Sequence, residues 1–370
     1  MSAKKLLAVL IMATFASIAF AHKASDSFLY VDMDASEIRF DIALRDLALL
    51  VPLDANGDQR ITGQELRAQR TLATQAVENA ITLTGEQGVC KLRGLAWGLS
   101  SHSDGPYLAT QYQVDCPNGE LPEQIEYSLL FDQDSLHRGL VQITSGEAQS
   151  LAVLAPDRQT VDLAGGAAGP WSTFTTFLRE GVIHLLIGLD HMLFLLVLVL
   201  PATLIIRRQS NQGTARSFKS RLLQLAGIVT AFTVAHSITL ALSALNIVRL
   251  PIAWVETVIA FSIAAAALNV AWPFMGRKTW KLAFAFGLIH GFGFASVLGD
   301  LTGGVSNLAL ALAGFNLGVE FGQLGLLIIG FPLLYAMAHV RAYQRFIVPL
   351  ILMGVGTVSL MWVAERAGAI

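Results

Sequence analysis

The sequence predicts an α-helical polytopic membrane bundle of six transmembrane helices, preceded by a small exported α+β domain. Hydrophobic residues make up 54% of the 370 residues and charged residues only 14%, whereas soluble domains contain about 25% charged residues. The second half of the chain holds six apolar stretches of about 20 residues or more, the length that crosses a bilayer. The first half begins with an export signal and continues with short alternating stretches typical of strands.

Residues 1–21 have the features of a signal peptide. Lys4 and Lys5 precede an apolar run, and Ala19-Phe20-Ala21 is an A-x-A cleavage site. We therefore expect the mature chain to begin at His22. An amino-terminal histidine can bind a metal ion through its amine and ring, although the simpler interpretation is that His22 merely follows the cleavage site.

Residues 22–163 are predicted to form the exported α+β domain. Alternation of polar and apolar residues predicts strands at 27–32 and 37–44, and further strands are expected at 107–116, 125–131, 140–144 and 151–154. Residues 65–81 are rich in Ala, Leu, Gln and Arg and predict a helix. The small residues and proline of 164–172 predict a linker. Residues 173–370 are predicted to form the transmembrane domain.

The chain has two cysteines, Cys90 and Cys116, both in the exported domain. Export to an oxidising compartment favours a disulfide over two buried free thiols. The bond would close a loop of about 26 residues and contribute about 3 kcal/mol in the chain-entropy model.

Residues 54–65 resemble an EF-hand calcium loop. The ligand positions fall on Asp54, Asn56, Asp58, Arg60 (through its carbonyl), Thr62 and Glu65. The loop departs from the motif at position 6, where Gln59 replaces the usual glycine. The alternative is a turn rich in Asp and Asn that binds nothing.

The six predicted spans lie near 176–206, 222–246, 251–275, 280–299, 307–338 and 345–364. The first and fifth are long enough to require tilt or a break. The basic residues gather in the loops after the first, third and fifth spans. We therefore expect a multi-pass protein of a bacterial-type inner membrane. The positive-inside rule places these loops in the cytoplasm and the exported domain on the periplasmic side. The net charge of −2 and the lack of a basic block argue against nucleic acid as a partner.

Ionisable and amide side chains inside the apolar spans are the main functional signal. They are His184, Asp190, His191, His236, Glu256, His290, Asn316 and Glu320. Each carboxylate costs about 2.5–3.5 kcal/mol at a helix centre on insertion scales. Imidazole and carboxylate together are ligands for a divalent transition metal. The alternative is a network of interhelical hydrogen bonds.

His184 and His191 are seven residues apart. On a continuous helix they would lie on one face, about 20° apart and two turns from each other. Asp190 directly precedes His191, so the three residues form one predicted ligand group.

His184-x-x-x-Gly188-x-Asp190-His191 resembles the signature of the HupE/UreJ family of membrane proteins. The His236-Ser, His290-Gly-Phe-Gly-Phe-Ala and Phe315-Asn-Leu-Gly-Val-Glu320 segments resemble a longer branch that has an exported N-terminal domain. Leu185 stands where shorter members have proline. The resemblance implies a nickel or cobalt permease connected with a metalloenzyme maturation system.

We therefore expect a permease, not an enzyme, whose partners are membrane lipid and a transition-metal ion. Nickel and cobalt are favoured, with zinc and copper as alternatives, and calcium is expected at the exported loop. Three other hypotheses remain: a bis-histidine haem protein, an intramembrane metal hydrolase, and a non-transporting metal or calcium sensor or accessory protein.

Overall fold

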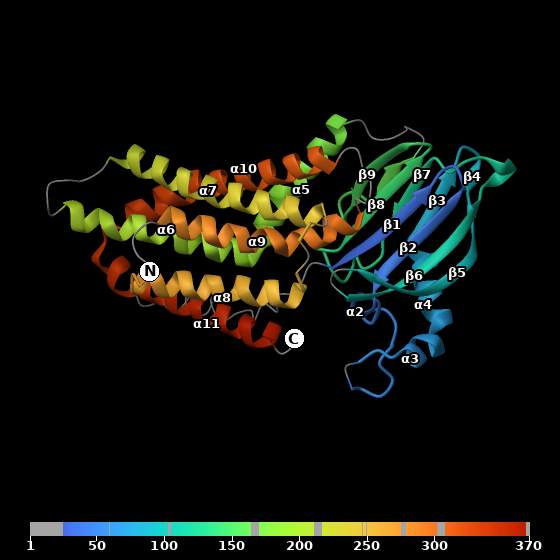
Figure 1. Cartoon of the computed structure of the whole chain (residues 1–370), viewed down its shortest axis with the longest axis horizontal. Coiled ribbons are helices and arrows are strands. Elements are labelled where there is room, and N and C mark those ends of the chain that lie inside the picture. The colour runs from blue at the N-terminus through green and yellow to red at the C-terminus, as the bar shows by residue number, and fades with distance from the viewer. Residues whose placement is uncertain are drawn as a thin grey trace, which may run out of the picture.

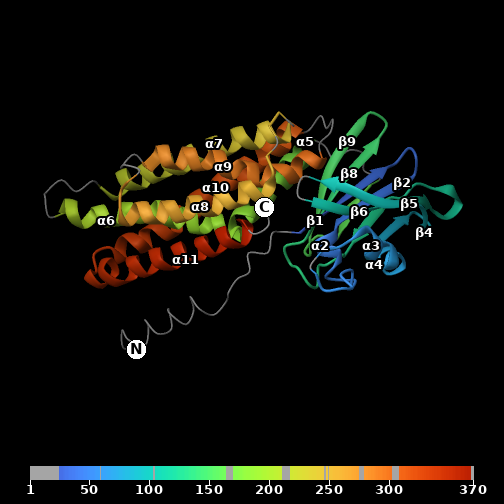
Figure 2. The ribbon, with the colours of Figure 1, turned by 60° about the horizontal axis from the view of Figure 1, so that its bottom comes forward.

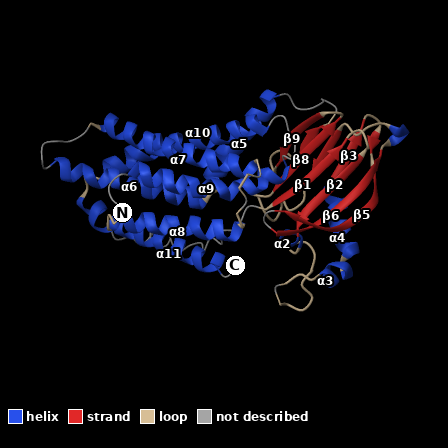
Figure 3. Cartoon of the chain, viewed as in Figure 1, coloured by secondary structure: helices blue, strands red, loops and turns tan. Residues whose placement is uncertain are grey.

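The computed structural model describes residues 25–58, 60–102, 105–163, 170–210, 217–245, 247–248, 250–274, 279–301 and 308–367. Strands gather at one end of the molecule and long helices at the other (Figures 1 and 3). The predicted signal peptide, His22 and Gln59 lie outside the described residues. The expected order, an α+β region followed by a helical region, is confirmed.

The α+β region contains two sheets. One has the strand order β5-β6-β2-β1-β8-β9 and the other β10-β7-β3-β4. Strand β1 pairs in parallel with β8, and all other pairings between the described strands are antiparallel. The strands are β1 (Asp26–Asp32), β2 (Glu37–Ala43), β3 (Ile81–Gly85), β4 (Gly88–Val89), β5 (Lys91–His102), β6 (Gly105–Asp115), β7 (Gln124–Tyr127), β8 (Arg138–Ser145), β9 (Ala148–Leu154) and β10 (Thr160–Asp162).

The core of this region lies where the sheets meet the short helices α2 (Leu44–Leu47), α3 (Gly63–Ala68) and α4 (Arg70–Ala80). Phe40, Val77 and Tyr127 are buried there in one apolar cluster.

The helix predicted at 65–81 forms two helices, α3 and α4, which are separated at Gln69. Strand β5 was not predicted, because its two glycines and its outward-facing Leu95 and Leu99 hide the alternation.

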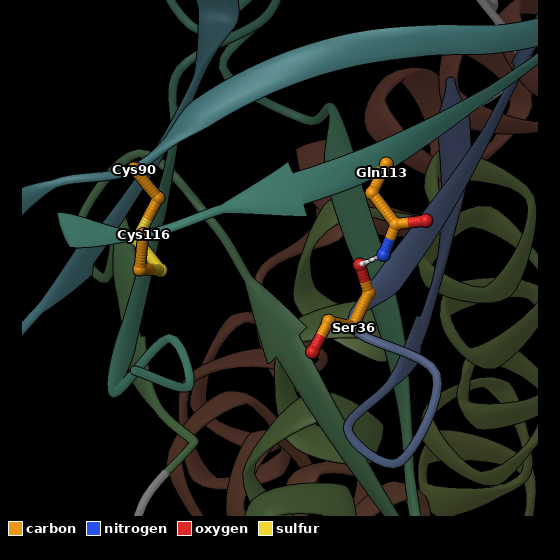
Figure 4. The surroundings of a disulfide bond; sticks show 4 residues. All are labelled: Ser36, Cys90, Gln113 and Cys116. Carbon is orange, nitrogen blue, oxygen red and sulfur yellow. Dashed lines mark hydrogen bonds between the residues drawn. A yellow bond between two sulfur atoms is a disulfide. The ribbon is translucent and has the colours of Figure 1, made fainter. Parts of the chain in front are cut away.

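Cys90 and Cys116 form the predicted disulfide. The bond joins the chain just before β5 to the chain just after β6, two strands that also pair along their length. Figure 4 shows it beside the hydrogen bond that Gln113 Nε2 donates to the Ser36 carbonyl at 2.9 Å. The pairing and the covalent bond therefore hold the same edge of the sheet.

The helical region runs lengthwise away from the sheets in both views (Figures 1 and 2). Its helices are α5 (Pro170–Ile187), α6 (Leu189–Ser210), α7 (Phe218–Ala244), α8 (Ile252–Ala271), α9 (Thr279–Leu301), α10 (Leu308–Met337) and α11 (Val348–Ala367), with a π-helical turn η2 (Tyr343–Ile347) before α11. Helix α5 begins at Pro170, inside the predicted linker.

Four segments in the described part of the chain are long and apolar enough to cross a membrane, or five if α5 and α6 are one bent span. They are compatible with a multi-pass membrane protein. The prediction of six spans is not confirmed: α9 is outside this set, and the side chains of residues 294–301 are not described.

The first predicted span is broken. Helices α5 and α6 meet at Gly188 with a bend of 72°. Of the two features expected from its length, tilt or a break, the structure has a break here, whereas α10 is continuous.

Glycines allow two pairs of helices to approach closely. A Cβ at Gly181, Gly314 or Gly318 would overlap the backbone of the facing helix between α5 and α10. A Cβ at Gly287 or Gly291 would do the same between α9 and α7. These small faces hold together the helices that carry the predicted ligands.

The sheet packs onto one end of the helical region. Phe28 and Tyr107 from the sheet share an apolar cluster with Phe177 of α5, Leu240 of α7 and Phe315 of α10. The α+β region therefore covers the ends of these three helices.

Candidate metal centre

Four histidine side chains from four helices meet inside the helical region. They are His184 on α5, His191 on α6, His236 on α7 and His290 on α9. The ring of His191 is central: its centroid is 5.0 Å from that of His184, 5.3 Å from His290 and 6.1 Å from His236. His191, His236 and His290 are at most 5% exposed, so three imidazoles are enclosed by protein.

The bend at Gly188 brings His184 and His191 together. The prediction that they share one face of a continuous helix is wrong, because the helix ends between them. Two turns of straight helix span about 11 Å, whereas the bend places the ring centroids 5.0 Å apart. A Cβ at Gly188 would lie 2.8 Å from the His184 carbonyl oxygen and 3.1 Å from His191 Nδ1, so the break is fitted closely to the cluster.

The rings of His191, His236 and His290 each have a hydrogen-bond partner on one nitrogen. His191 Nδ1 lies 3.1 Å from Asp190 Oδ1, and His236 Nδ1 lies 3.1 Å from Asn316 Oδ1 on α10. His290 Nε2 lies 3.2 Å from Ser262 Oγ on α8. These partners fix the orientation of the rings, as partners of metal-binding histidines do.

The second nitrogen of each of these rings is buried and has no hydrogen-bond partner among the described residues. These atoms are Nε2 of His191, Nε2 of His236 and Nδ1 of His290. A buried polar nitrogen without a partner costs about 1–3 kcal/mol. These three nitrogens are therefore available to a ligand.

The cluster is not arranged as a finished metal site. Within the described residues, no group of three or more His, Cys, Asp or Glu side chains has the geometry to hold an ion. Ligand nitrogens lie about 2.0–2.1 Å from a zinc-like ion, which places neighbouring ring centres roughly 5 Å apart. The ring of His191 has that spacing to the rings of His184 and His290.

Aromatic side chains surround the four rings. Phe194 and Phe232 lie 5.2 Å and 5.3 Å from the ring of His290, and Phe315 lies 5.3 Å from that of His184. Phenylalanine rings therefore line the histidine cluster.

The other predicted membrane ligands take different positions. Asn316 contacts His236 through its oxygen and donates Nδ2 to the Leu312 carbonyl at 2.8 Å, so it orients a histidine. Glu320 accepts a hydrogen bond from Thr230 Oγ1 at 2.6 Å. Glu256 lies on α8, where its backbone carbonyl accepts from Arg366 at 2.9 Å.

The predicted calcium loop is exposed and closed by its own hydrogen bonds. Asp54 Oδ1 accepts from Gly57 N at 2.8 Å, and Asp58 Oδ1 accepts from Arg60 N at 2.8 Å. The two Glu65 oxygens accept from Ala55 N and Thr62 N, so this carboxylate also caps α3. The left-handed turn falls at Gly57 (φ +74°), position 4 of the loop. Calcium binding stays a prediction, which thermal unfolding of the full chain with and without Ca²⁺ would test.

Two groups near the site were not predicted from the sequence. Ser262 is one of two hydroxyl residues in α8, which is otherwise almost wholly apolar, and this contrast was the available signal. Glu180 on α5 is 8% exposed and lies 3.4 Å from Arg158 and 3.6 Å from Arg138 of the α+β region. A lone glutamate near the start of a span carries no comparable signal.

Comparison with known proteins gives one result. Residues 160–366 match the family model described as HupE / UreJ protein. The match covers more than half of the chain and includes all four histidines of the cluster. A search of curated proteins finds no match.

Proposed function

The chain belongs to the HupE/UreJ family, and from this premise we propose that it is a membrane permease for a divalent transition metal. The family comprises nickel- and cobalt-related membrane proteins connected with metal uptake or with urease and hydrogenase maturation. Nickel and cobalt are therefore the favoured substrates, with zinc and copper as alternatives because imidazole also binds them.

The observation that carries the proposal is the cluster of four imidazoles around His191. Conduction requires a site that binds an ion well enough to admit it and weakly enough to release it. Neighbouring rings that do not converge on one point suit a transient site better than a permanent metal centre. Asp190, beside His191, supplies a negative charge to balance the cation.

Polar side chains continue from the cluster along the contact between α7 and α10. Beyond the His236–Asn316 pair, Thr233 Oγ1 donates to Gln323 Oε1 at 3.0 Å, and Thr230 donates to Glu320. We propose that the ion moves along these polar side chains after it leaves the histidine cluster. A divalent cation driven by the membrane potential gains about 4.6 kcal/mol per 100 mV.

The orientation follows from the sequence: the α+β region is periplasmic and the basic loops are cytoplasmic, in a bacterial-type inner membrane. The exported domain would then meet the metal first, whether or not it also binds calcium. We propose transport rather than catalysis, since no nucleophile motif accompanies the histidines.

Haem binding and sensing are the main alternatives. An absorption spectrum with a Soret band would favour haem. A sensor or accessory protein would bind metal without moving it, so uptake by proteoliposomes separates it from a permease.

The decisive experiment is uptake of Ni²⁺, Co²⁺, Zn²⁺ and Cu²⁺ by proteoliposomes containing the full chain. His191→Ala should reduce uptake at least 100-fold at an unchanged protein level, because His191 is the ring that contacts the other three. His339→Ala, an exposed histidine after α10, is the matched control and should transport normally. Normal uptake by His191→Ala would rule out the proposed path.

A further inference from the structure

Each hydrogen bond in the histidine cluster also determines which ring nitrogen carries the proton. A neutral imidazole has one N–H donor and one bare nitrogen, and the neighbour of one nitrogen decides between them. Only the bare nitrogen can bind a metal ion. The partners of the rings therefore decide which atom each histidine presents to the substrate.

Ser262 is the partner whose role is most fully determined. Its hydroxyl donates to the Ile259 carbonyl on the same helix at 2.7 Å. A hydroxyl has a single proton, so Ser262 Oγ can only accept at its 3.2 Å contact with His290 Nε2. His290 must then carry its proton on Nε2, which leaves Nδ1 bare.

The bare nitrogen is the one that the protein leaves without a partner. His290 Nδ1 is buried and accepts no hydrogen bond from any described residue. His290 is 1% exposed and its ring lies 5.3 Å from that of His191. The nitrogen selected by Ser262 is thus available inside the cluster and closed to solvent.

His191 and His236 are fixed in the opposite sense. Asp190 and Asn316 face their Nδ1 atoms as acceptors, the amide of Asn316 being oriented by its bond to the Leu312 carbonyl. These two rings therefore present Nε2. Of the rings of His191, His236 and His290, only that of His290 is held with Nδ1 free to bind a metal ion. Ser262 is the residue that holds it in this state.

We propose that Ser262 is a positioning residue that holds His290 as its Nε2–H tautomer and so presents Nδ1 to the transported metal ion. The inference rests on the proposed function for the identity of the ligand, but the tautomer itself can be measured without transport. Ser262 lies on α8, which carries none of the four histidines, so it adds this helix to the site, as Asn316 adds α10.

The first test is spectroscopic. Full-chain protein with ¹⁵N-labelled histidine, reconstituted in lipid, should show a protonated Nε2 and a bare Nδ1 for His290, assigned by the signals lost in His290→Asn. In Ser262→Ala the acceptor is gone, and we expect His290 to lose this single tautomer. A protonated Nδ1 in the unmodified protein would overturn the proposal, even if Ser262→Ala fails to fold.

The second test is binding of Co²⁺, followed by its visible absorption. Ser262→Ala should weaken Co²⁺ binding by about 10- to 100-fold, the usual effect of removing such a partner, and Ser262→Thr should restore it by keeping the hydroxyl. Thr257→Val removes a hydroxyl that, among the described residues, bonds only to the Ala253 carbonyl of α8, and it should change neither measurement.

Unchanged tautomer and unchanged Co²⁺ affinity in Ser262→Ala would also overturn the assignment. Failure of the proposed function is a separate result: Co²⁺ would bind with the predicted dependence on Ser262, while proteoliposomes would take up no metal.

Discussion

At the scale of single residues, His137 should make the stability of the α+β region depend on pH. The side chain is fully buried, with Nδ1 2.6 Å from Ser25 Oγ and Nε2 2.5 Å from Tyr127 Oη. Burial lowers the pKa of His137 to about 4. In the unfolded chain histidine titrates near about 6.5, so the unfolded state binds a proton first. Stability should therefore fall as the pH decreases from about 6.5 to about 4.

The loss should reach about 3 kcal/mol across that range. Fluorescence-detected unfolding of the full chain in detergent at pH 7 and pH 5 would measure most of it. His137→Gln should be less stable at pH 7 but should flatten the pH dependence, whereas the exposed His339→Gln should keep it. An equal decrease in wild type and His137→Gln would show that other groups are responsible.

At the scale of elements, the break between α5 and α6 forms the site. Gly188→Ala would place a Cβ 2.8 Å from the His184 carbonyl oxygen and 3.2 Å from Asp190 Oδ1, so the bend or the rings must move. We expect metal uptake to fall at least 10-fold while the protein still folds. Gly227→Ala in α7 has no heavy atom within 4 Å of its new Cβ and should transport normally. Equal uptake by the two variants would contradict this role of Gly188.

Periodicity predicts elements well and their geometry less well. The strands at 27–32 and 37–44 appear as β1 and β2 because one face of each is buried. The break in the first span could be expected from its length, but not its 72° angle, which depends on packing against other helices. Strand β5 was not predicted, because its apolar residues are partly exposed and do not alternate with its polar residues.

The site itself was predicted in part. The four histidines and Asp190 were predicted because ionisable side chains inside apolar spans are costly to bury and need polar partners. Glu256 and Glu320 were predicted as ligands on the same ground, and their role as ligands stays a prediction; Glu320 accepts a hydrogen bond from Thr230. Ser262 was not predicted, because a single serine in a helix can bond a backbone carbonyl of that helix, and its burial then costs little free energy. The sequence does not show that it lies beside a histidine.

At the scale of the whole molecule, the α+β region and the histidine cluster are joined by continuous packing. Phe315 packs in the apolar cluster beneath the sheet with Phe28 and Tyr107, and its ring lies 5.3 Å from that of His184. The packing that docks the sheet on α5 therefore continues to the ring of His184.

Glu180 is the charged centre of that docking, one turn of α5 before His184. Its carboxylate faces Arg138 at 3.6 Å, Arg158 at 3.4 Å and Arg179 at 3.2 Å. Glu180→Ala should leave cations of the α+β region without a counter-charge at a mostly buried contact and weaken docking by on the order of 2–3 kcal/mol. Hydrogen exchange of the β8, β9 and α5 amides should then speed up together.

Asp157→Asn is the control: it removes an exposed carboxylate that is also bonded to Arg179, and it should change the docking free energy by less than about 0.5 kcal/mol. Equal exchange rates in the two variants would show that the apolar contacts alone hold the sheet on the helices.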